Sequence, residues 1–344
     1  MLCFILGTRP EYIKLSPIWE NLPDESYRVL FTGQHDHRDF MKKPLANNMY
    51  AYEYNPFARS LAETQHYLQE NITSYLGREI YTGVVVQGDT ASAFAGALVA
   101  FQLELPIYHI EAGLRTYDLA SPFPEEGYRQ MISRIASVHF CPTQPNFTNI
   151  LAEPSNRSTS AVRKTGNPGL PTSSEKVEHG PKVLVTMHRR ENFPLLPDWF
   201  VTINKIASLH PEFEFIIPLH HNPNVQKHRE LLTNLKVIDP LPHEELISLL
   251  RECSFVISDS GGIQEECTYY NKRCFVCRTI TERPEGCVSG HLLLCSTPGH
   301  LLELWEKQHK NPDFPFGPCP FYQKDSAKNI AQILIELDNP TAIK

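Results

Sequence analysis

The chain has no surplus of basic residues. Asp and Glu (39) outnumber Lys and Arg (32), which gives a formal net charge of −7. A protein whose main partner is nucleic acid needs Lys and Arg to neutralise phosphates, so this balance argues against that class. Lys and Arg occur inside short motifs rather than in runs, and a local anion pocket is therefore compatible with the overall charge.

The chain also has no hydrophobic run of membrane-spanning length, so we predict no membrane partner. Its first residues, MLCFILGTRPEY, start apolar but include no basic region and no cleavage site. They predict a first buried strand rather than a signal peptide, and we expect a cytoplasmic protein. No internal repeat, coiled-coil heptad or low-complexity tract is present in the sequence.

Paired metal-binding cysteines are missing as well. The nine cysteines are scattered, and Cys274 and Cys277 form a CxxC pair with no second pair and no histidine at zinc spacing. We predict no metal site and interpret the cysteines as buried, reduced thiols of a cytosolic protein. The sequence has no GxGxxG motif either, so we predict no nicotinamide cofactor.

What the chain does have is length and a repeating pattern. Its 344 residues suffice for two domains, and 41% hydrophobic and 21% charged residues are typical of a globular protein. Short apolar runs alternate with helical patterns in two series, separated by a polar linker over 150–180. We predict an α/β fold of two Rossmann-like, doubly wound domains facing a central cleft. Their predicted bounds are 1–165 and 166–325, followed by a C-terminal helix in 326–344 that could cross back to the first domain.

The stretch FVISDSGGIQEE (255–266) predicts a strand, a glycine turn and the start of a helix. The exposed amides and the helix dipole at such a junction bind anions, most often phosphate. Gly261 and Gly262 let the backbone approach the anion closely, and Glu266 could accept a hydrogen bond from a sugar hydroxyl. An ordinary turn with Ser260 at the helix N-cap is the alternative interpretation.

Charged residues also follow the strands predicted in the first series. Arg9 and Lys14 lie after the first strand, and Asp89 and Glu111 end two successive strands later in the chain. Because parallel strands end at the same edge of a sheet, Asp89 and Glu111 should face one crevice. Taken alone, Asp89 could equally be a helix N-cap and Glu111 a solvated loop acid.

Further candidates lie on a helix and at strand ends. Glu125 and Arg129 lie on a helix that follows a proline-bearing loop, and we interpret the neighbouring Glu126 as structural. His188 and His220 follow strands of the second series. Taken alone, His188 would more often be a hydrogen-bonded strand-end histidine than a catalytic one.

Ten motifs in a fixed order make the chain resemble the non-hydrolysing UDP-N-acetylglucosamine 2-epimerases. They run from residue 7 to residue 285, so the resemblance covers nearly the whole chain and is far more specific than a single glycine-rich loop. The motifs are GTRPEYIK (7–14), TGQH (32–35), QGDT (87–90), EAGLRTYDL (111–119), SPFPEEGYR (121–129), TGNP (165–168), HRREN (188–192), HHNPNV (220–225), SDSGGIQEE (258–266) and TERPE (281–285).

The resemblance implies a fold, a reaction and partners. The fold is two Rossmann-like domains in the glycosyltransferase-B arrangement. The reaction is the reversible inversion of C2 in the GlcNAc unit of UDP-GlcNAc, giving UDP-ManNAc without a redox cofactor. It proceeds by elimination of UDP to an enzyme-bound 2-acetamidoglucal and re-addition. The resemblance also implies a homodimer that serves cell-surface polysaccharide biosynthesis.

The resemblance further implies roles for individual residues, and it leaves open which carboxylate is the base and which is the acid. The implied catalytic residues are Asp89, Glu111, Glu125 and His188. The implied substrate and UDP-binding residues are Arg9, Lys14, Arg129, His220, Ser260, Gly261, Gly262, Glu266 and Arg283, with Glu285 on the same loop as Arg283. Gln34 and His35 match a region that forms a regulatory UDP-GlcNAc site in many bacterial members.

The sequence departs from the family pattern at three places. Pro194 stands where a glycine is usual, the segment after TGNP reads GLPTSS, and the C-terminal segment reads CPFYQKDSA. Three alternatives therefore stay open. The chain could act on another UDP-2-acetamido sugar, it could be a hydrolysing epimerase that releases UDP and ManNAc, or it could be a non-catalytic UDP-sugar sensor.

Overall fold

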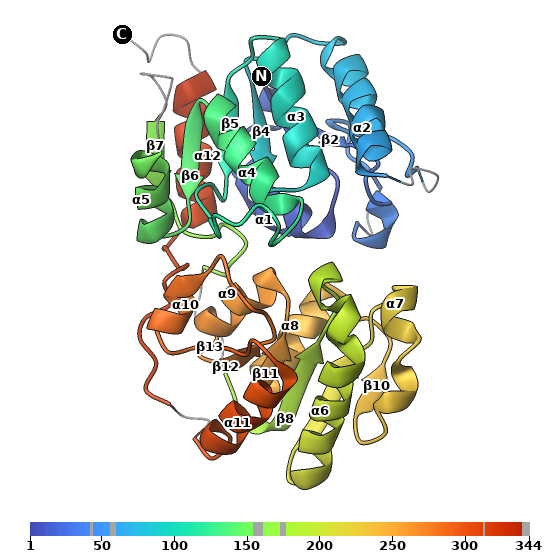
Figure 1. Ribbon diagram of the computed structural model, residues 1–344. Helices are drawn as coiled ribbons and strands as arrows, with labels where there is room; N and C mark the ends of the chain where they lie inside the picture. The colour runs from blue at the N-terminus through green and yellow to red at the C-terminus, as the bar shows by residue number, and fades with distance from the viewer. Residues whose placement is uncertain (42–43, 56–59, 154–160, 173–176, 312–313, 339–344) are drawn as a thin grey trace. The chain divides into compact units, whose positions relative to one another are not determined.

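The computed structural model describes residues 1–344 except 42–43, 56–59, 154–160, 173–176, 312–313 and 339–344. The chain forms two compact units (Figure 1). Unit 1 comprises Met1–Thr172 and Tyr322–Lys344, and unit 2 comprises Ser173–Phe321.

Unit 1 is built on a seven-stranded parallel sheet in the order β3-β2-β1-β4-β5-β6-β7. Its central strands are buried on both faces, which explains their continuous apolar sequences. The strands are β1 (Leu2–Leu6), β2 (Tyr27–Phe31), β3 (Met49–Ala51), β4 (Gly83–Gln87), β5 (Ile107–Ile110), β6 (Val138–Cys141) and β7 (Ala161–Lys164).

Helices cover both faces of this sheet, as the alternation along β1 demonstrates. Cys3 and Ile5 belong to one hydrophobic core, while Leu2, Phe4 and Leu6 belong to another on the opposite face. The helices are α1 (Arg9–Trp19), α2 (Leu61–Leu76), α3 (Ala91–Gln102), α4 (Glu125–Ile135), α5 (Gln144–Ala152) and α12 (Ser326–Asp338), with short 3-10 turns at Asp24–Ser26 and His37–Asp39.

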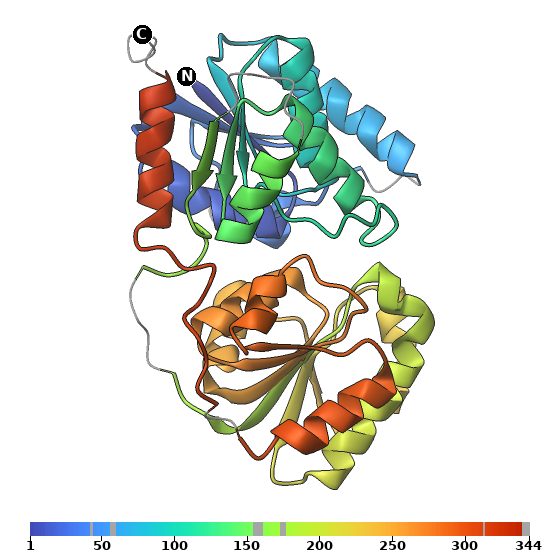
Figure 2. The ribbon, with the colours of Figure 1, turned by 60° about the vertical axis from the view of Figure 1, so that its left-hand side comes forward.

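The last helix, α12, belongs to unit 1 although it follows unit 2 in the chain. It packs against α1 beside the first unit's sheet (Figure 2). Its apolar stripe contributes Ile330, Ala331 and Leu334 to the core that also holds Phe4. The two ends of the chain are therefore tied into one unit by hydrophobic burial.

Unit 2 repeats the same architecture with a six-stranded parallel sheet in the order β10-β9-β8-β11-β12-β13. Its strands are β8 (Gly180–Thr186), β9 (Glu214–Pro218), β10 (Lys236–Ile238), β11 (Cys253–Ser258), β12 (Arg273–Val276) and β13 (Leu292–Leu294). Its helices are α6 (Leu196–Leu209), α7 (Pro223–Gln226), α8 (His243–Glu252), α9 (Gly261–Tyr269), α10 (Pro284–Val288) and α11 (Pro298–Gln308), with 3-10 turns at Arg190–Leu195 and Arg229–Leu231.

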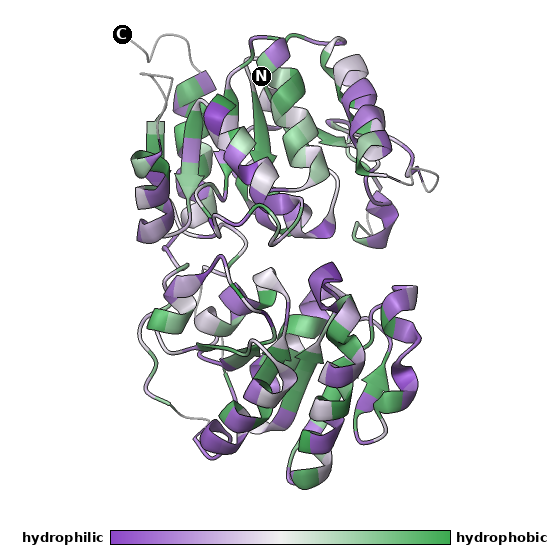
Figure 3. Cartoon of the chain, in the orientation of Figure 1, coloured by the Kyte–Doolittle hydropathy of each residue, from purple (hydrophilic) through white to green (hydrophobic). Residues whose placement is uncertain are grey.

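Both sheets follow the classical doubly wound order, in which the first strand lies at the centre and the chain reverses direction beside it. The strands β4, β6 and β8 are coloured mostly hydrophobic, whereas the helices are two-toned (Figure 3). The predicted α/β class with two Rossmann-like domains is therefore confirmed. In the part of the chain that the structure describes, no helix is both long and apolar enough to cross a membrane.

Two predicted segments differ from the structure. The sequence near 225–234 predicts a helix, but the structure has the short α7 and a 3-10 turn there. Val225 and Leu232 are buried, and no continuous apolar stripe between them supports further helical turns. The polar linker predicted over 150–180 contains β7, an edge strand of unit 1 whose Arg163 and Lys164 are exposed.

Candidate functional site

The carboxyl ends of β4 and β5 bring two predicted acids to adjacent positions. Gln87 pairs with Ile110 in the register of these strands, so Asp89 and Glu111 follow neighbouring strand ends. Gly88 makes the turn between strand and acid with a φ of 68°, a value that favours glycine. The predicted meeting of the two strand ends at one edge of the sheet is therefore present in unit 1.

Glu111 lies at the centre of a charged cluster. One carboxylate oxygen pairs with the ammonium of Lys14 from α1, and the other accepts a hydrogen bond from the amide of Gln87. Its backbone has a φ of 62°, a left-handed conformation that costs energy for a residue other than glycine. Such strain is concentrated at functional sites.

Asp89 is held by a cation from another element. Arg129 of α4 donates to the Asp89 carboxylate, with its Nε 3.0 Å from Oδ2, and also contacts Glu126 at 3.2 Å. Thr90, not Asp89, caps α3, because its hydroxyl accepts from the amide of Ala93. The Asp89 side chain therefore does not cap α3.

Glu126 and Glu125 differ in burial although they are adjacent. Glu126 is fully buried and accepts hydrogen bonds from the amides of Thr116 and Tyr117, which agrees with the predicted structural role. Glu125 is half-buried at the first residue of α4, one helical turn before Arg129. That spacing puts Glu125 on the helix face that carries the Arg129–Asp89 pair.

Glu11 is a buried acid that was not predicted from the sequence. Its carboxylate accepts from the amides of Gly7 and Thr8, from the Thr8 hydroxyl at 2.8 Å and from the Thr90 hydroxyl at 2.7 Å. Burial raises the pKa of Glu11 from 4.5 to about 7, against the opposing effect of these hydrogen bonds. Glu11 joins the turn after β1 to the residue after Asp89. The Thr8-x-x-Glu11 capping box is the sequence signal that could have identified Glu11.

The predicted residues at the start of unit 1 lie around the same turn. Arg9 is the half-buried first residue of α1. Gln34 accepts from the amide and hydroxyl of Ser92 at 2.9 and 2.7 Å, and it is close enough to Gly7 to exclude any side chain there. His35 is exposed beside it.

The same strand-end arrangement occurs in unit 2. Ser258 pairs with Thr186, so Asp259 and the segment after β8 follow adjacent strands. Asp259 is fully buried and accepts from the amides of His188 and Arg189, at 3.0 and 2.9 Å, and from the side chain of Asn192. Asp259 therefore fixes the backbone that carries His188. The sequence indicates Asp259 only as part of a glycine turn.

His188 lies against His220, and the two rings stack at a centroid distance of 5.5 Å. Burial lowers the pKa of His188, although Asp259, whose carboxylate is 3.6 Å from Nδ1, acts in the opposite direction. A lowered pKa favours the neutral imidazole, which can either donate or accept a proton. His220 is itself exposed.

The N-terminus of α9 is lined by guanidinium groups. Ser260 occupies the N-cap position without a side-chain capping hydrogen bond. A Cβ on Gly261 would be 2.7 Å from Arg283 and 3.2 Å from Arg189, whereas one on Gly262 would meet no heavy atom of the described residues within 4 Å. Helix amides and arginines together form an anion-binding arrangement.

Among the remaining predicted residues of unit 2, Arg283 and Glu266 form ion pairs. Arg283 is buried and pairs with Glu265 at 2.5 Å and with Glu282, so its guanidinium is fixed beside α9. Glu266 accepts from His243 at 2.7 Å, and Glu285 is buried in α10. Each unit therefore brings its own predicted set together: acids with their cations in unit 1, and histidines with a guanidinium-lined helix end in unit 2.

Comparison with known proteins finds relatives along nearly the whole chain. A family model described as UDP-N-acetylglucosamine 2-epimerase matches residues 20–335. The UDP-N-acetylglucosamine 2-epimerase of Neisseria meningitidis is 34% identical in an alignment that covers 96% of this chain and 97% of the relative. That of Campylobacter jejuni is 34% identical in an alignment that covers 84% of each chain.

Solved structures agree with this assignment. UDP-GlcNAc 2-epimerase from Neisseria meningitidis, bound to UDP-GlcNAc, matches 97% of this chain and 99% of its own with a TM-score of 0.86 and 29% identity. The enzyme from Methanocaldococcus jannaschii, in complex with UDP-GlcNAc and UDP, covers the same shares with a TM-score of 0.80 and 28% identity. MurG from Acinetobacter baumannii shares the fold alone, with a TM-score of 0.59 and 13% identity over 97% of this chain and 98% of its own.

Proposed function

The chain belongs to the UDP-N-acetylglucosamine 2-epimerase family, and from this premise we propose that it converts UDP-GlcNAc reversibly into UDP-ManNAc by inverting C2. The family membership agrees with the resemblance carried by the ten sequence motifs. The relatives named above supply the substrate class, and the residues of this chain supply the roles that follow.

The observation that carries the proposal is the pair of strand-end acids in unit 1. The C2 proton is weakly acidic, so its removal needs a base within hydrogen-bonding reach. Inversion also requires a proton on the opposite face, and more than one carboxyl group serves that need. We assign Asp89, Glu111 and Glu125 to these proton transfers, supported by the pairing of Lys14 with Glu111 and of Arg129 with Asp89.

Unit 2 is proposed to bind the nucleotide. The amides of Ser260, Gly261 and Gly262 and the guanidinium of Arg283 would hold the diphosphate, because developing negative charge on a leaving group is best stabilised by fixed donors. Glu266 would contact the ribose and Arg9 the phosphates. His188, stacked on His220, would act near the diphosphate as a neutral imidazole.

We propose that the reaction proceeds by elimination and re-addition without hydrolysis. UDP would leave C1 as the C2 proton is removed, which gives a 2-acetamidoglucal. This intermediate must be shielded from water until UDP adds back at C1 and a proton adds to the opposite face of C2. The same first half-reaction followed by water attack would release ManNAc and UDP. Retention of the bound intermediate therefore separates an epimerase from a hydrolase.

Incubation with UDP-GlcNAc in deuterated water tests these points together. The expected result is a mixture of UDP-GlcNAc and UDP-ManNAc with deuterium at C2 of both sugars, measured by NMR. A Glu111→Gln variant serves as the inactive reference. UDP-ManNAc without deuterium would contradict the proton-transfer mechanism.

The same reaction mixture distinguishes the other candidate activities. Stoichiometric free UDP would identify a hydrolysing epimerase, and binding of UDP-GlcNAc without turnover would identify a sensor. A panel of UDP-2-acetamido sugars, including 6-deoxy and uronate forms, tests the choice of sugar. We expect plain UDP-GlcNAc to be inverted fastest.

We further propose a cytoplasmic homodimer that serves cell-surface polysaccharide biosynthesis, following the family resemblance. The nine cysteines are free thiols, which suits a reducing compartment. We also propose a regulatory UDP-GlcNAc site at Gln34 and His35. Sigmoidal substrate kinetics that become hyperbolic in His35→Ala would support it, and hyperbolic kinetics in both proteins would oppose it.

A further inference from the structure

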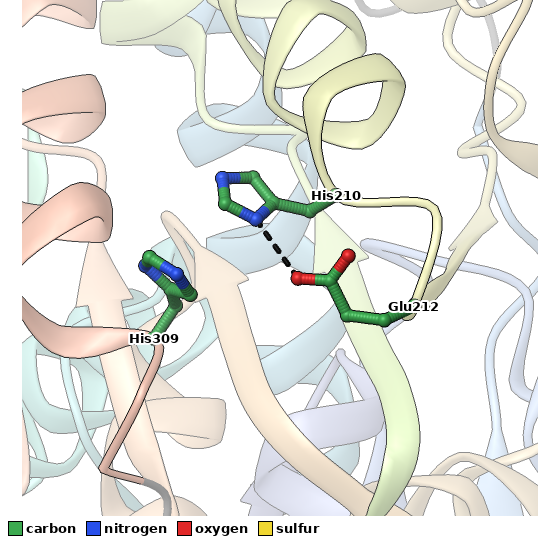
Figure 4. A group of neighbouring side chains, drawn as sticks. All are labelled: His210, Glu212 and His309. Atoms are coloured by element: carbon green, nitrogen blue, oxygen red, sulfur yellow. Dashed lines mark hydrogen bonds and ion pairs between the residues drawn. The ribbon is translucent and has the colours of Figure 1, made fainter.

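Two helices of unit 2 end side by side, each at a histidine. The helices α6 and α11 pack against each other, and their C-caps are His210 and His309. A turn closed by the Phe213 amide on the His210 carbonyl brings Glu212 back to the same point. The three side chains gather from both helix ends (Figure 4). Residues about 100 positions apart thus form one cluster that sequence spacing does not reveal.

The cluster offers three ligand atoms at close range. One nitrogen of His210, one oxygen of Glu212 and one nitrogen of His309 all lie within 4.8 Å of one another. His210 Nδ1 and Glu212 Oε1 are 3.0 Å apart. Zinc with bonds of about 2.0–2.2 Å holds neighbouring ligand atoms ~3.3 Å apart. Zinc binding therefore requires the two ligand atoms that lie farthest apart to approach each other by up to ~1.5 Å.

Both histidines have hydrogen bonds that orient them as ligands. His309 Nδ1 lies 2.9 Å from the carbonyl oxygen of Trp305, which can only accept, so Nδ1 carries the proton and Nε2 keeps its lone pair. His210 Nε2 lies 3.1 Å from the Glu306 carboxylate, which leaves Nδ1 for a ligand. Metal-binding histidines in proteins are oriented by the same carbonyl and carboxylate partners.

The electrostatic surroundings favour a cation. Both helices direct their carbonyl ends, the negative pole of the helix dipole, at the cluster. Glu212 and Glu306 add two carboxylates. The ring of Trp305 packs against His210 at 5.8 Å and is parallel to His309 at 6.1 Å, so an apolar wall closes one side. These features favour the binding of a cation at the cluster.

We propose that His210, Glu212 and His309 bind a zinc-class divalent metal ion, with Glu306 orienting His210. Two imidazoles and one carboxylate suit zinc and the later transition metals, whereas Mg²⁺ and Ca²⁺ prefer oxygen ligands. The ion ties the C-terminus of α6 to that of α11 and stabilises unit 2. This role is independent of the epimerase reaction, because none of these residues belongs to the proposed site.

Zinc titration of the full-length, untagged protein tests the proposal after dialysis against a chelator. We expect one zinc per chain by calorimetry and a higher thermal unfolding midpoint with zinc, since a ligand that binds the folded state stabilises it. Cobalt in place of zinc should give visible absorption bands of a site with imidazole ligands. Magnesium should produce neither effect.

Matched variants localise the site. His309→Ala and Glu212→Gln should abolish the zinc-dependent shift, and Glu306→Gln should weaken zinc binding by roughly 10–100-fold. His66→Ala, which disrupts the exposed His66–Glu70 pair in unit 1, should leave the shift unchanged. Glu212 is half-exposed, so its variant is expected to fold even if His309→Ala does not. Absence of the zinc shift in wild-type protein, or its persistence in Glu212→Gln, would overturn the proposal.

Discussion

At the scale of single residues, charge pairing organises the acids of unit 1. Glu111 is paired with Lys14 and hydrogen-bonded by Gln87, while Asp89 is paired with Arg129. Each acid is thus held in one orientation by a partner from another element. A proton-transfer group must be positioned before it can act, so this pairing supports the roles proposed for Asp89 and Glu111.

Glu111→Gln is expected to lower the epimerisation rate by about 10²–10⁴-fold, the usual contribution of a general acid or base. The variant should still fold, because the amide is nearly isosteric and the Gln87 contact can be kept, but it should lose some stability because Lys14 loses its carboxylate partner. The turnover number and the rate of deuterium exchange at C2 would measure the effect. Glu70→Gln, a change at an exposed helical acid, should retain wild-type activity. Equal exchange rates in wild type and Glu111→Gln would remove Glu111 from the proposed mechanism.

The raised pKa of Glu11 predicts that the stability of the protein depends on pH. Its pKa is about 7 when folded against an ordinary value of 4.5, so the folded state binds the proton more tightly. The free energy of unfolding that this difference contributes is fully present below pH 4.5 and is lost as pH rises to about 7. Its size is on the order of 3 kcal/mol, at about 1.4 kcal/mol per pKa unit. Glu11→Gln should flatten this decline. Denaturant unfolding of both proteins at a series of pH values measures it, and parallel profiles would contradict the prediction.

At the scale of elements, the start of α9 combines tight and open positions. Gly261 is needed because Arg283 and Arg189 occupy the space of a side chain, whereas Gly262 faces open space. The fold alone does not demand a glycine at position 262. A bound diphosphate would demand one, because it must approach the backbone closely.

Gly262→Ala therefore separates folding from binding. Alanine in a helix is favoured over glycine by roughly 0.5–1 kcal/mol, so the free energy of unfolding should rise or stay level. The affinity for UDP should fall, because the methyl group enters the proposed diphosphate site. Calorimetry with UDP and thermal unfolding are the two measurements.

Gly299→Ala is the matched control for this change. Gly299 lies in the first turn of α11, where an added Cβ meets only Thr297 Oγ1, at 4.0 Å, among the described residues. It should raise stability in the same way and leave UDP binding unaltered. If Gly262→Ala bound UDP as tightly as Gly299→Ala, the diphosphate would have to bind elsewhere.

The elements also differ in how well sequence predicts them. Central strands such as β4 and β11 were predicted from continuous apolar runs, because both of their faces are buried. The edge strands β3 and β7 were missed, since their residues are partly buried or exposed and read as loop. Local composition reports burial, and edge strands lack the burial that makes the pattern visible.

At the scale of the whole molecule, unit 1 contains both β1 and α12, the first strand and the last helix in chain order. This helix returns from unit 2 to pack against α1 in unit 1. Leu334 is fully buried in the core of unit 1, while its neighbour Ile335 is 38% exposed. The stability of the N-terminal unit therefore depends on the last helix of the chain.

Leu334→Ala should destabilise unit 1 by about 2–5 kcal/mol, the cost of a cavity in a packed core. Hydrogen exchange followed by mass spectrometry would detect faster exchange in peptides of unit 1 and unchanged exchange in unit 2. Ile335→Ala, one residue further along the same helix, should have little effect. Similar exchange in both variants would mean that α12 contributes little to the core.

The sequence by itself determined the family, the fold class and the candidate acids at strand ends. These depend on patterns that are visible in the sequence alone: apolar runs, glycine turns and the order of the motifs along the chain. The tertiary structure alone decided which cation holds each acid, that Asp259 supports the backbone of His188, and that His210, Glu212 and His309 meet. Apart from His210 and Glu212, which are two positions apart, these contacts join residues 40 to 99 positions apart, and side-chain packing rather than local propensity selects them.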